Sequence, residues 1–404
     1  MGISQIPPVP TPTAKGEIIV GTATGPTKIT ASTTANFSLL TDSTTATGLK
    51  YGQTGKVWGS VFDNFPLTPS GNVGRPSTAI RYDAGYYWFG TSAGCIVYST
   101  DAKNWTASNI FGTTNSVEAI AANTAGTAFV AVGAANKCFS ATSIPGTWTS
   151  RTSGLSGTVT IADVIWVGGS INLFILCGEP SATSNVISTS PDGATWTGRL
   201  SLANTIGSLT VNTANNVIIA SVVTTNIGYY STNGTTWTSI ANALATTHYN
   251  FSYFPHLDRW QDYNSGASFT SANYNVAWTA GTRVGSFRTD LVNIYSSGYG
   301  RGTLGRPLWD ATNNRYYALT TTPNGPSNML LQTFSNASVQ KTGGGYFDLV
   351  RTDISPVPLM GSSIGSTTHT YSNLPALGFG NGIWVVAMAD PGQNSHPVIV
   401  STAP

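Results

Sequence analysis

The chain has 404 residues, and only 8% of them are charged, against about 25% in ordinary soluble proteins. Its net charge of +2, from 18 Lys and Arg against 16 Asp and Glu, offers no basic track for nucleic acid. No apolar run reaches the roughly 18 residues that span a bilayer, so we expect no membrane insertion. Gly, Thr, Ser, Asn and aromatic residues dominate instead, which predicts an all-β protein of short strands and tight turns.

The first residues predict an extended arm. Met1 to Thr13 carries Pro7, Pro8, Pro10 and Pro12, and proline disfavours both helices and sheet pairing. Such an arm cannot bury a core alone, so we expect it to lie against a partner surface.

Two short apolar runs follow the arm, at Glu17 to Val20 and Phe37 to Leu40. The segments Ala14 to Thr22 (AKGEIIVGT) and Leu39 to Tyr51 (LLTDSTTATGLKY) resemble a module of structural proteins of tailed bacteriophages, from which Lys28 to Asn36 departs. The resemblance implies a virion component whose residues 1–50 attach it to other virion proteins, in the capsid or the tail. A generic Ser- and Thr-rich leader is the alternative interpretation.

From about Gly52 the chain becomes periodic. Trp residues recur at positions 105, 148, 196, 237 and 278, at separations of 43, 48, 41 and 41 residues. Four short strands per period and no 3.6-residue apolar rhythm are typical of β-propeller blades rather than helical repeats. Residues 51–404 are therefore predicted to form a β-propeller. The insertions Val284 to Gly302 and Asp348 to Tyr371 are expected to be loops.

The final unit, from Ser372, has three apparent strands but no Trp strand of its own. Gly55 to Asp63 carries Trp58 with no repeat before it, and it predicts the missing strand. We expect it to pair with the strand around Val398 and Val400, which closes a ring of seven blades and removes exposed sheet edges.

Three units share a turn in which a Ser lies six residues before a Trp, with Asp or Asn two residues after the Ser. These Ser–Asx–Trp turns are Ser99, Asp101 and Trp105; Ser190, Asp192 and Trp196; and Ser231, Asn233 and Trp237. The short side chains are expected to accept hydrogen bonds from the turn's own amides, above a Trp that acts as a hydrophobic plug. The pattern resembles the Asp-box hairpin of sialidases and many other propellers, which implies a fold rather than a function.

The sequence shows no recognisable set of catalytic residues. A sialidase-like site would need three Arg, a Tyr beside a Glu, and an acid, and no such Arg triad recurs. Glu118, Asp163 and Arg81 fall on predicted inner strands, where paired polar groups lining a central channel are the expected interpretation. The three Cys and four His show no metal-ligand spacing. We therefore expect no enzyme activity, no catalytic residue, no metal and no cofactor.

One aromatic group is compatible with binding. Trp260 lies in the fifth unit, and Tyr295, Tyr299 and Arg301 lie in the insertion after it. Such residues can stack against sugars, so they are candidate glycan-binding residues. The alternative is that these rings pack between blades.

Together these patterns predict a structural protein of a tailed-phage virion, present in several copies or as a homo-oligomer. The propeller would be displayed at the particle surface. A receptor-binding adhesin that recognises a host surface glycan is the alternative, and a glycan hydrolase is the third hypothesis.

Overall fold

The computed structural model describes residues 18–22, 25–29, 37–41, 49–53, 58–62, 73–157, 160–212, 216–222, 228–240, 251–254, 259–263, 268–271, 279–281, 308–310, 315–321, 329–341, 346–357, 376–389 and 397–402. Apart from one short 3-10 helix, η1 (Ala134–Asn136), every regular element in these ranges is a β-strand. No helix among them is long and apolar enough to cross a membrane. The chain divides into two compact units, Met1–Val57 and Trp58–Pro404, a few residues beyond the predicted division at residue 50.

The first unit contains two antiparallel hairpins. β1 (Ile18–Thr22) pairs with β2 (Gly25–Ile29), and β3 (Phe37–Thr41) pairs with β4 (Leu49–Gln53). β1 and β3 contain most of the two predicted apolar runs. The proline-rich arm, Met1 to Thr13, lies outside the described residues.

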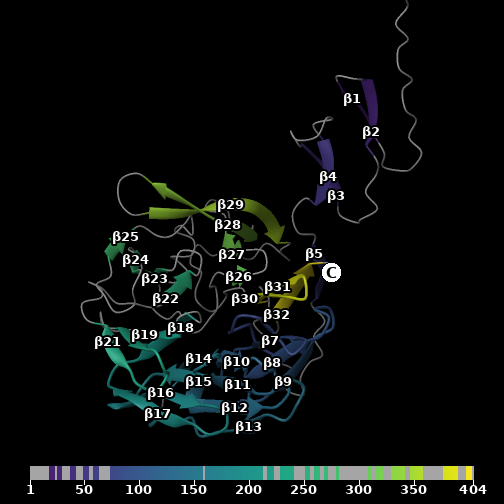
Figure 1. The fold of residues 1–404 in the computed structure, drawn as a ribbon. Coiled ribbons are helices and arrows are strands. Elements are labelled where there is room, and N and C mark those ends of the chain that lie inside the picture. The colour runs from purple at the N-terminus through teal and green to yellow at the C-terminus, as the bar shows by residue number, and fades with distance from the viewer. Residues whose placement is uncertain are drawn as a thin grey trace, which may run out of the picture. The chain divides into compact units, whose positions relative to one another are not determined.

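The described strands of the second unit form seven four-stranded antiparallel sheets, which we number along the chain (Figure 1). Sheets 1 to 4 are β6 (Arg81–Asp83), β7 (Tyr86–Gly90), β8 (Cys95–Ser99), β9 (Thr106–Asn109); β10 (Val117–Ala122), β11 (Phe129–Gly133), β12 (Lys137–Ala141), β13 (Thr149–Ser150); β14 (Ile161–Val167), β15 (Leu173–Gly178), β16 (Ser184–Ser190), β17 (Thr197–Leu202); and β18 (Ile206–Asn212), β19 (Val217–Val222), β20 (Gly228–Ser231), β21 (Thr238–Ile240). Sheets 5 and 6 are β22 (Phe251–Phe254), β23 (Arg259–Tyr263), β24 (Ser268–Ser271), β25 (Thr279–Gly281); and β26 (Leu308–Asp310), β27 (Arg315–Thr321), β28 (Met329–Lys341), β29 (Tyr346–Val357).

Sheet 7 joins strands from distant parts of the sequence. Its order is β30 (Ala376–Gly380), β31 (Ile383–Ala389), β32 (Pro397–Thr402) and β5 (Trp58–Phe62). β5 lies antiparallel to β32, with Val61 opposite Val400 and Trp58 opposite Thr402. The predicted pairing of these two strands is confirmed.

One predicted loop is wrong in part. The insertion Asp348 to Tyr371 was expected to be irregular, but its first residues belong to β29, which pairs along most of β28. The Val, Thr and Ile residues of YFDLVRTDISPV favour a strand, and they outweigh the Pro near its end. The insertion Val284 to Gly302 lies outside the described residues.

The second strand of each well-described sheet is buried on both faces, and its side chains alternate between two neighbouring sheets. In β7, Tyr87 and Phe89 pack in a cluster with sheet 7, whereas Trp88 packs in a cluster with sheet 2. In β15, Phe174 and Leu176 face sheet 2, and Ile175 and Cys177 face sheet 4. Because side chains alternate along a strand with a period of two, one strand contributes to two cores.

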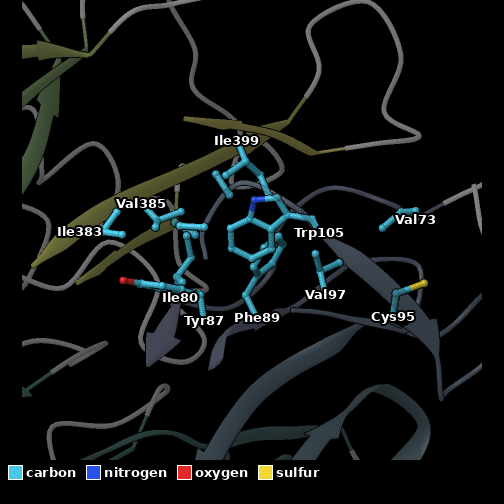
Figure 2. Close-up of a cluster of buried hydrophobic side chains, with 13 residues drawn as sticks. Val73, Ile80, Tyr87, Phe89, Cys95, Val97, Trp105, Ile383, Val385 and Ile399 are labelled. Atoms are coloured by element: carbon cyan, nitrogen blue, oxygen red, sulfur yellow. The ribbon is translucent and has the colours of Figure 1, made fainter. Parts of the chain in front are cut away.

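These shared clusters link the sheets in one sequence, from sheet 7 through sheets 1, 2, 3 and 4 to sheet 5. The cluster between sheets 7 and 1 is drawn in Figure 2, where the indole of Trp105 lies between Ile399 of β32 and Phe89 of β7. The rings of Phe89 and Trp105 meet edge to face, with centroids 5.8 Å apart. Sheets 7 and 1, far apart in the sequence, therefore share a continuous core.

One buried hydrogen bond crosses the same junction. The hydroxyl of Tyr87, on β7, donates to the carbonyl oxygen of Gly380 at the end of β30. Gly380 has no side chain, and a Cβ there would overlap the ring of Tyr82. Burial raises the pKa of the Tyr87 hydroxyl, with a smaller contribution from Tyr82, so this group stays protonated as a donor.

Replacing Tyr87 with Phe should destabilise the second unit by about 1–3 kcal/mol, because it leaves the buried Gly380 carbonyl without its donor. Urea unfolding would measure the loss. Tyr86→Phe is the matched control, since the neighbouring hydroxyl makes no hydrogen bond within the described part of the chain. Equal midpoints for the two variants would show that the junction does not depend on this bond.

Candidate functional site: turns that fasten neighbouring sheets

The Ser–Asx–Trp turns all lie between the third and fourth strands of their sheets. In sheet 3, Asp192 Oδ1 accepts hydrogen bonds from the amides of Ala194 and Thr195, at 2.8 and 2.9 Å. Ser190 Oγ accepts from the amide of Gly193 at 2.8 Å. Two short side chains thus satisfy three amides that the tight turn would otherwise leave unpaired.

The other two turns use a similar arrangement, with Asp as the acceptor in one and Asn in the other. In sheet 1, Asp101 Oδ1 accepts from the amides of Lys103 and Asn104, at 2.8 and 2.7 Å. In sheet 4, Asn233 Oδ1 accepts from Thr235 and Thr236, both at 2.9 Å. The side-chain oxygens of Asn and Asp therefore accept the same two hydrogen bonds from turn amides, which explains why either residue occurs two positions after the Ser.

The Trp of each turn packs toward the preceding sheet. Trp105 belongs to the cluster between sheets 7 and 1, Trp196 to the one between sheets 2 and 3, and Trp237 to the one between sheets 3 and 4. Trp148, from the looser copy in sheet 2, packs between sheets 1 and 2. The turn therefore places its Trp between two sheets in addition to forming a local hydrogen-bonded structure. The sequence pattern alone did not predict this packing between sheets.

In sheets 3 and 4, the carbonyl of a glycine in the turn accepts a hydrogen bond from the Trp side chain. The indole N–H groups of Trp196 and Trp237 donate to the carbonyls of Gly193 and Gly234, at 3.1 and 3.2 Å. Both glycines have positive φ, 74° and 76°. In sheet 1 the corresponding residue is Ala102, with φ 57°, and the buried indole N–H of Trp105 has no hydrogen-bond partner among the described residues.

The pKa values of the two turn carboxylates, Asp101 and Asp192, lie below the ordinary value for Asp. Partial burial pushes the pKa of Asp101 upward, but the amides of Asn104 and Lys103 and the side chains of Asn104 and Ser99 outweigh it and hold the pKa at about 2. Asp192 is shifted in the same direction: burial alone would raise its pKa, but the amides of Thr195 and Ala194, the Ser190 hydroxyl and its own amide together lower it. In the two turns that contain Asp, the ionised carboxylate is therefore favoured.

Arg81, Glu118 and Asp163, the polar residues expected on inner strands, each have a hydrogen-bond or ion-pair partner within the protein. Arg81 forms an ion pair with Asp83 at 2.8 Å, and Glu118 accepts a hydrogen bond from Ser116. Asp163 is fully buried, and its Oδ2 accepts from the amide of Leu209 in sheet 4 at 2.9 Å. Its other oxygen accepts from the amide of Val164. Asp163 thus bridges sheets 3 and 4 and does not line an open channel.

The candidate glycan-binding group requires a correction. Trp260 is only 2% exposed, and its ring packs on Tyr253 with centroids 4.9 Å apart, in the cluster shared with sheet 4. A buried ring offers no face to a sugar, so Trp260 is a core residue. Tyr295, Tyr299 and Arg301 lie outside the described residues. In the described part of the chain, no group of three or more His, Cys, Asp or Glu is placed to hold a metal ion.

Gly193→Ala should destabilise the second unit through two effects. A Cβ at this position would come within 2.7 Å of Val130 Cγ2 in sheet 2. Such overpacking costs about 1–3 kcal/mol, and the left-handed backbone adds roughly 1–2 kcal/mol. Gly112→Ala is the control, because Gly112 also has positive φ but its added Cβ would meet nothing within 4 Å. A loss no larger than that of the control, in urea unfolding, would contradict a contact between sheets at this turn.

Asp101→Asn should change the pH dependence of stability more than its value at pH 7, since Asn233 already provides the same acceptor geometry. The pKa of Asp101 is about 2 in the folded chain, below its ordinary value of 3.8. Its stabilising contribution is therefore complete above that ordinary value and is lost as the pH falls toward 2. Urea midpoints of wild type and variant should converge over this range, whereas Asn233→Asp should gain acid sensitivity. Parallel profiles would argue against the carboxylate's role.

Known proteins resemble this chain in structure only. No family model matches it, and no curated protein does. A solved structure of YCF48 bound to D1 peptide is 12% identical, with a TM-score of 0.50, and covers 82% of this chain and 96% of its own. The propeller domain of Cps50 (Swd1) from Myceliophteria thermophila is 8% identical, TM-score 0.52, with coverage of 86% and 100%. YCF48 from Cyanidioschyzon merolae is 13% identical, TM-score 0.51, with coverage of 86% and 99%. Together with the seven four-stranded sheets, these likenesses show an all-β protein with a β-propeller fold.

Proposed function

We propose that this protein is a structural component of a tailed-phage virion, held on the particle by residues 1–57 and displaying its propeller at the surface. The observation that carries the proposal is the first unit. Its strand β1 lies in one of the two segments that resemble the phage module, β3 and β4 overlap the other, and the unit is compact by itself. The expected partners are other virion proteins, of the capsid or the tail.

We further propose that the seven sheets form a closed ring, with sheet 7 as the closing blade. The pairing of β5 with β32 supports closure, because it joins the start of the propeller to its last repeat. The core shared by sheets 7 and 1 supports it as well. A ring whose closing sheet takes strands from both ends of its sequence resists opening, which suits a domain exposed on a particle.

Several features favour display over catalysis. The three charged residues predicted on inner strands have partners within the protein: Arg81 pairs with Asp83, Glu118 accepts from Ser116, and Asp163 bridges sheets 3 and 4. The similar propeller of YCF48 has been solved with a bound peptide, which supports a protein partner as the ligand class. The adhesin alternative depends on Tyr295, Tyr299 and Arg301 without Trp260, and the hydrolase hypothesis has no candidate catalytic group.

Two truncations test the anchor and the closure separately. Removal of Met1–Val57 leaves β5 in place, so the propeller should keep its unfolding midpoint but disappear from purified particles, as measured by mass spectrometry. Removal of residues 1–62 also deletes β5, so the propeller should lose stability. Incorporation of the shorter truncation into particles would refute the anchor. Equal stability of both truncations would refute the closing strand.

The full-length chain separates the remaining alternatives. Its peptides should be found in purified particles, and it should neither bind a glycan array nor release sugar from host polysaccharide. Specific glycan binding would favour the adhesin, and turnover would favour the hydrolase. Absence of the full-length chain from particles would refute the virion assignment.

A further inference from the structure

Two Asn–Gly pairs lie in exposed turns of the described residues, and their surroundings differ. Asn233–Gly234 lies in the Ser–Asx–Trp turn of sheet 4, and Asn381–Gly382 forms the turn between β30 and β31 of sheet 7. Because glycine has no side chain, the backbone nitrogen after each Asn is unhindered. That nitrogen can attack the Asn side-chain amide, which is the chemistry of spontaneous deamidation.

The pair in sheet 4 is held in place. The amide of Gly234 donates to Ser231 Oγ at 2.8 Å. The side-chain oxygen of Asn233 accepts from the amides of Thr235 and Thr236, both at 2.9 Å, and from the Thr235 hydroxyl at 3.1 Å. Attack by the Gly234 nitrogen would require breaking its own hydrogen bond and turning the Asn233 side chain away from its donors.

The Asn381–Gly382 pair in sheet 7 is exposed to solvent. Gly380 pairs with Ile383, so Asn381 and Gly382 alone form a two-residue hairpin turn, with φ values of 44° and 78°. The hydrogen bond that closes such a turn joins its first and fourth residues, Gly380 and Ile383, so the Gly382 amide takes no part in it. Neither that amide nor the Asn381 side chain makes a hydrogen bond to the described residues, and both residues are exposed. A Cβ on Gly382 would meet nothing within 4 Å, so the site is also uncrowded.

We propose that Asn381 is a site of spontaneous deamidation in the folded protein, and that the turn in sheet 4 protects Asn233. The Gly382 nitrogen loses its proton to solvent base and bonds to Cγ of Asn381. The bond from Cγ to Nδ2 then breaks, and ammonia leaves with a proton from solvent. Water opens the resulting succinimide at either carbonyl to give Asp or isoAsp. The net change consumes one water and releases one ammonia, without an oxidant or reductant.

The product has a structural consequence at the junction of sheets 7 and 1. An isoAsp residue inserts an extra methylene into the backbone of a two-residue turn, which changes the register that this turn sets for β30 and β31. The residue before the turn is Gly380, whose carbonyl accepts the buried hydrogen bond from Tyr87. Deamidated protein should therefore unfold at a lower urea concentration than fresh protein.

The test is to incubate the folded full-length chain at mildly alkaline pH, digest it, and quantify Asp and isoAsp at both positions by mass spectrometry. The Asn381 peptide should convert several-fold faster than the Asn233 peptide. In urea, where both turns are lost, the two rates should become similar. Ser231→Ala, which frees the Gly234 amide, should raise the rate at Asn233 and leave that at Asn381 unchanged.

Two results would overturn the proposal. One is conversion of Asn233 as fast as Asn381 in the folded chain. The other is reaction of Asn381 only in urea, which would show that its turn is protected too. Because the main comparison uses two sites in one wild-type sample, it does not depend on whether the Ser231 variant folds.

Discussion

The propeller depends on one packing constraint: a central strand that is buried on both faces must find a partner sheet on each side. β7, β11, β15 and β19 are almost wholly buried, and each sends alternate side chains into two different cores. A single four-stranded sheet with two apolar faces would be insoluble alone. Successive sheets therefore stack face to face, and the stack leaves no exposed apolar face only if the first and last sheets also meet.

The Ser–Asx–Trp turns serve this constraint at the outer part of each sheet. They hold a Trp against the preceding sheet while their own amides are satisfied by Ser and Asx side chains, as in Ser190 to Trp196. The protein needs few charged residues because apolar side chains fill its cores, and Ser and Asx side chains satisfy the amides of its turns. One charged group on an inner strand, Asp163, connects the backbones of adjacent sheets.

Much of the architecture was predictable from periodic features. The spacing of Trp residues gave the repeat, and the unmatched Trp58 strand predicted the composition of sheet 7, which is confirmed by its pairing with β32. The direction in which each Trp packs was not predictable, because a spacing says nothing about which neighbouring sheet a side chain faces. The choice between the two interpretations of Trp260, glycan binding or packing between blades, could not be made for the same reason: burial depends on residues from another sheet. β29 was missed because the insertion from Asp348 to Tyr371 is rich in Gly, Ser and Pro as a whole, although its first part carries the β-branched residues of a strand. The virion role and the ligand class stay predictions. They depend on partner-binding surfaces, and the repeat pattern of the sequence carries information about strands and cores only.

The central claim, that strands from both ends of the propeller sequence meet in one sheet, can be tested most directly by cross-linking in register. Val61 lies opposite Val400, whereas Val398, on the same strand β32, lies two residues out of register with Val61. The account predicts that Val61→Cys with Val400→Cys forms an intramolecular disulfide in the native monomer, found by mass spectrometry of a non-reduced digest, and that Val61→Cys with Val398→Cys does not. A cross-link for the second pair only, or for neither pair within one chain, would contradict it.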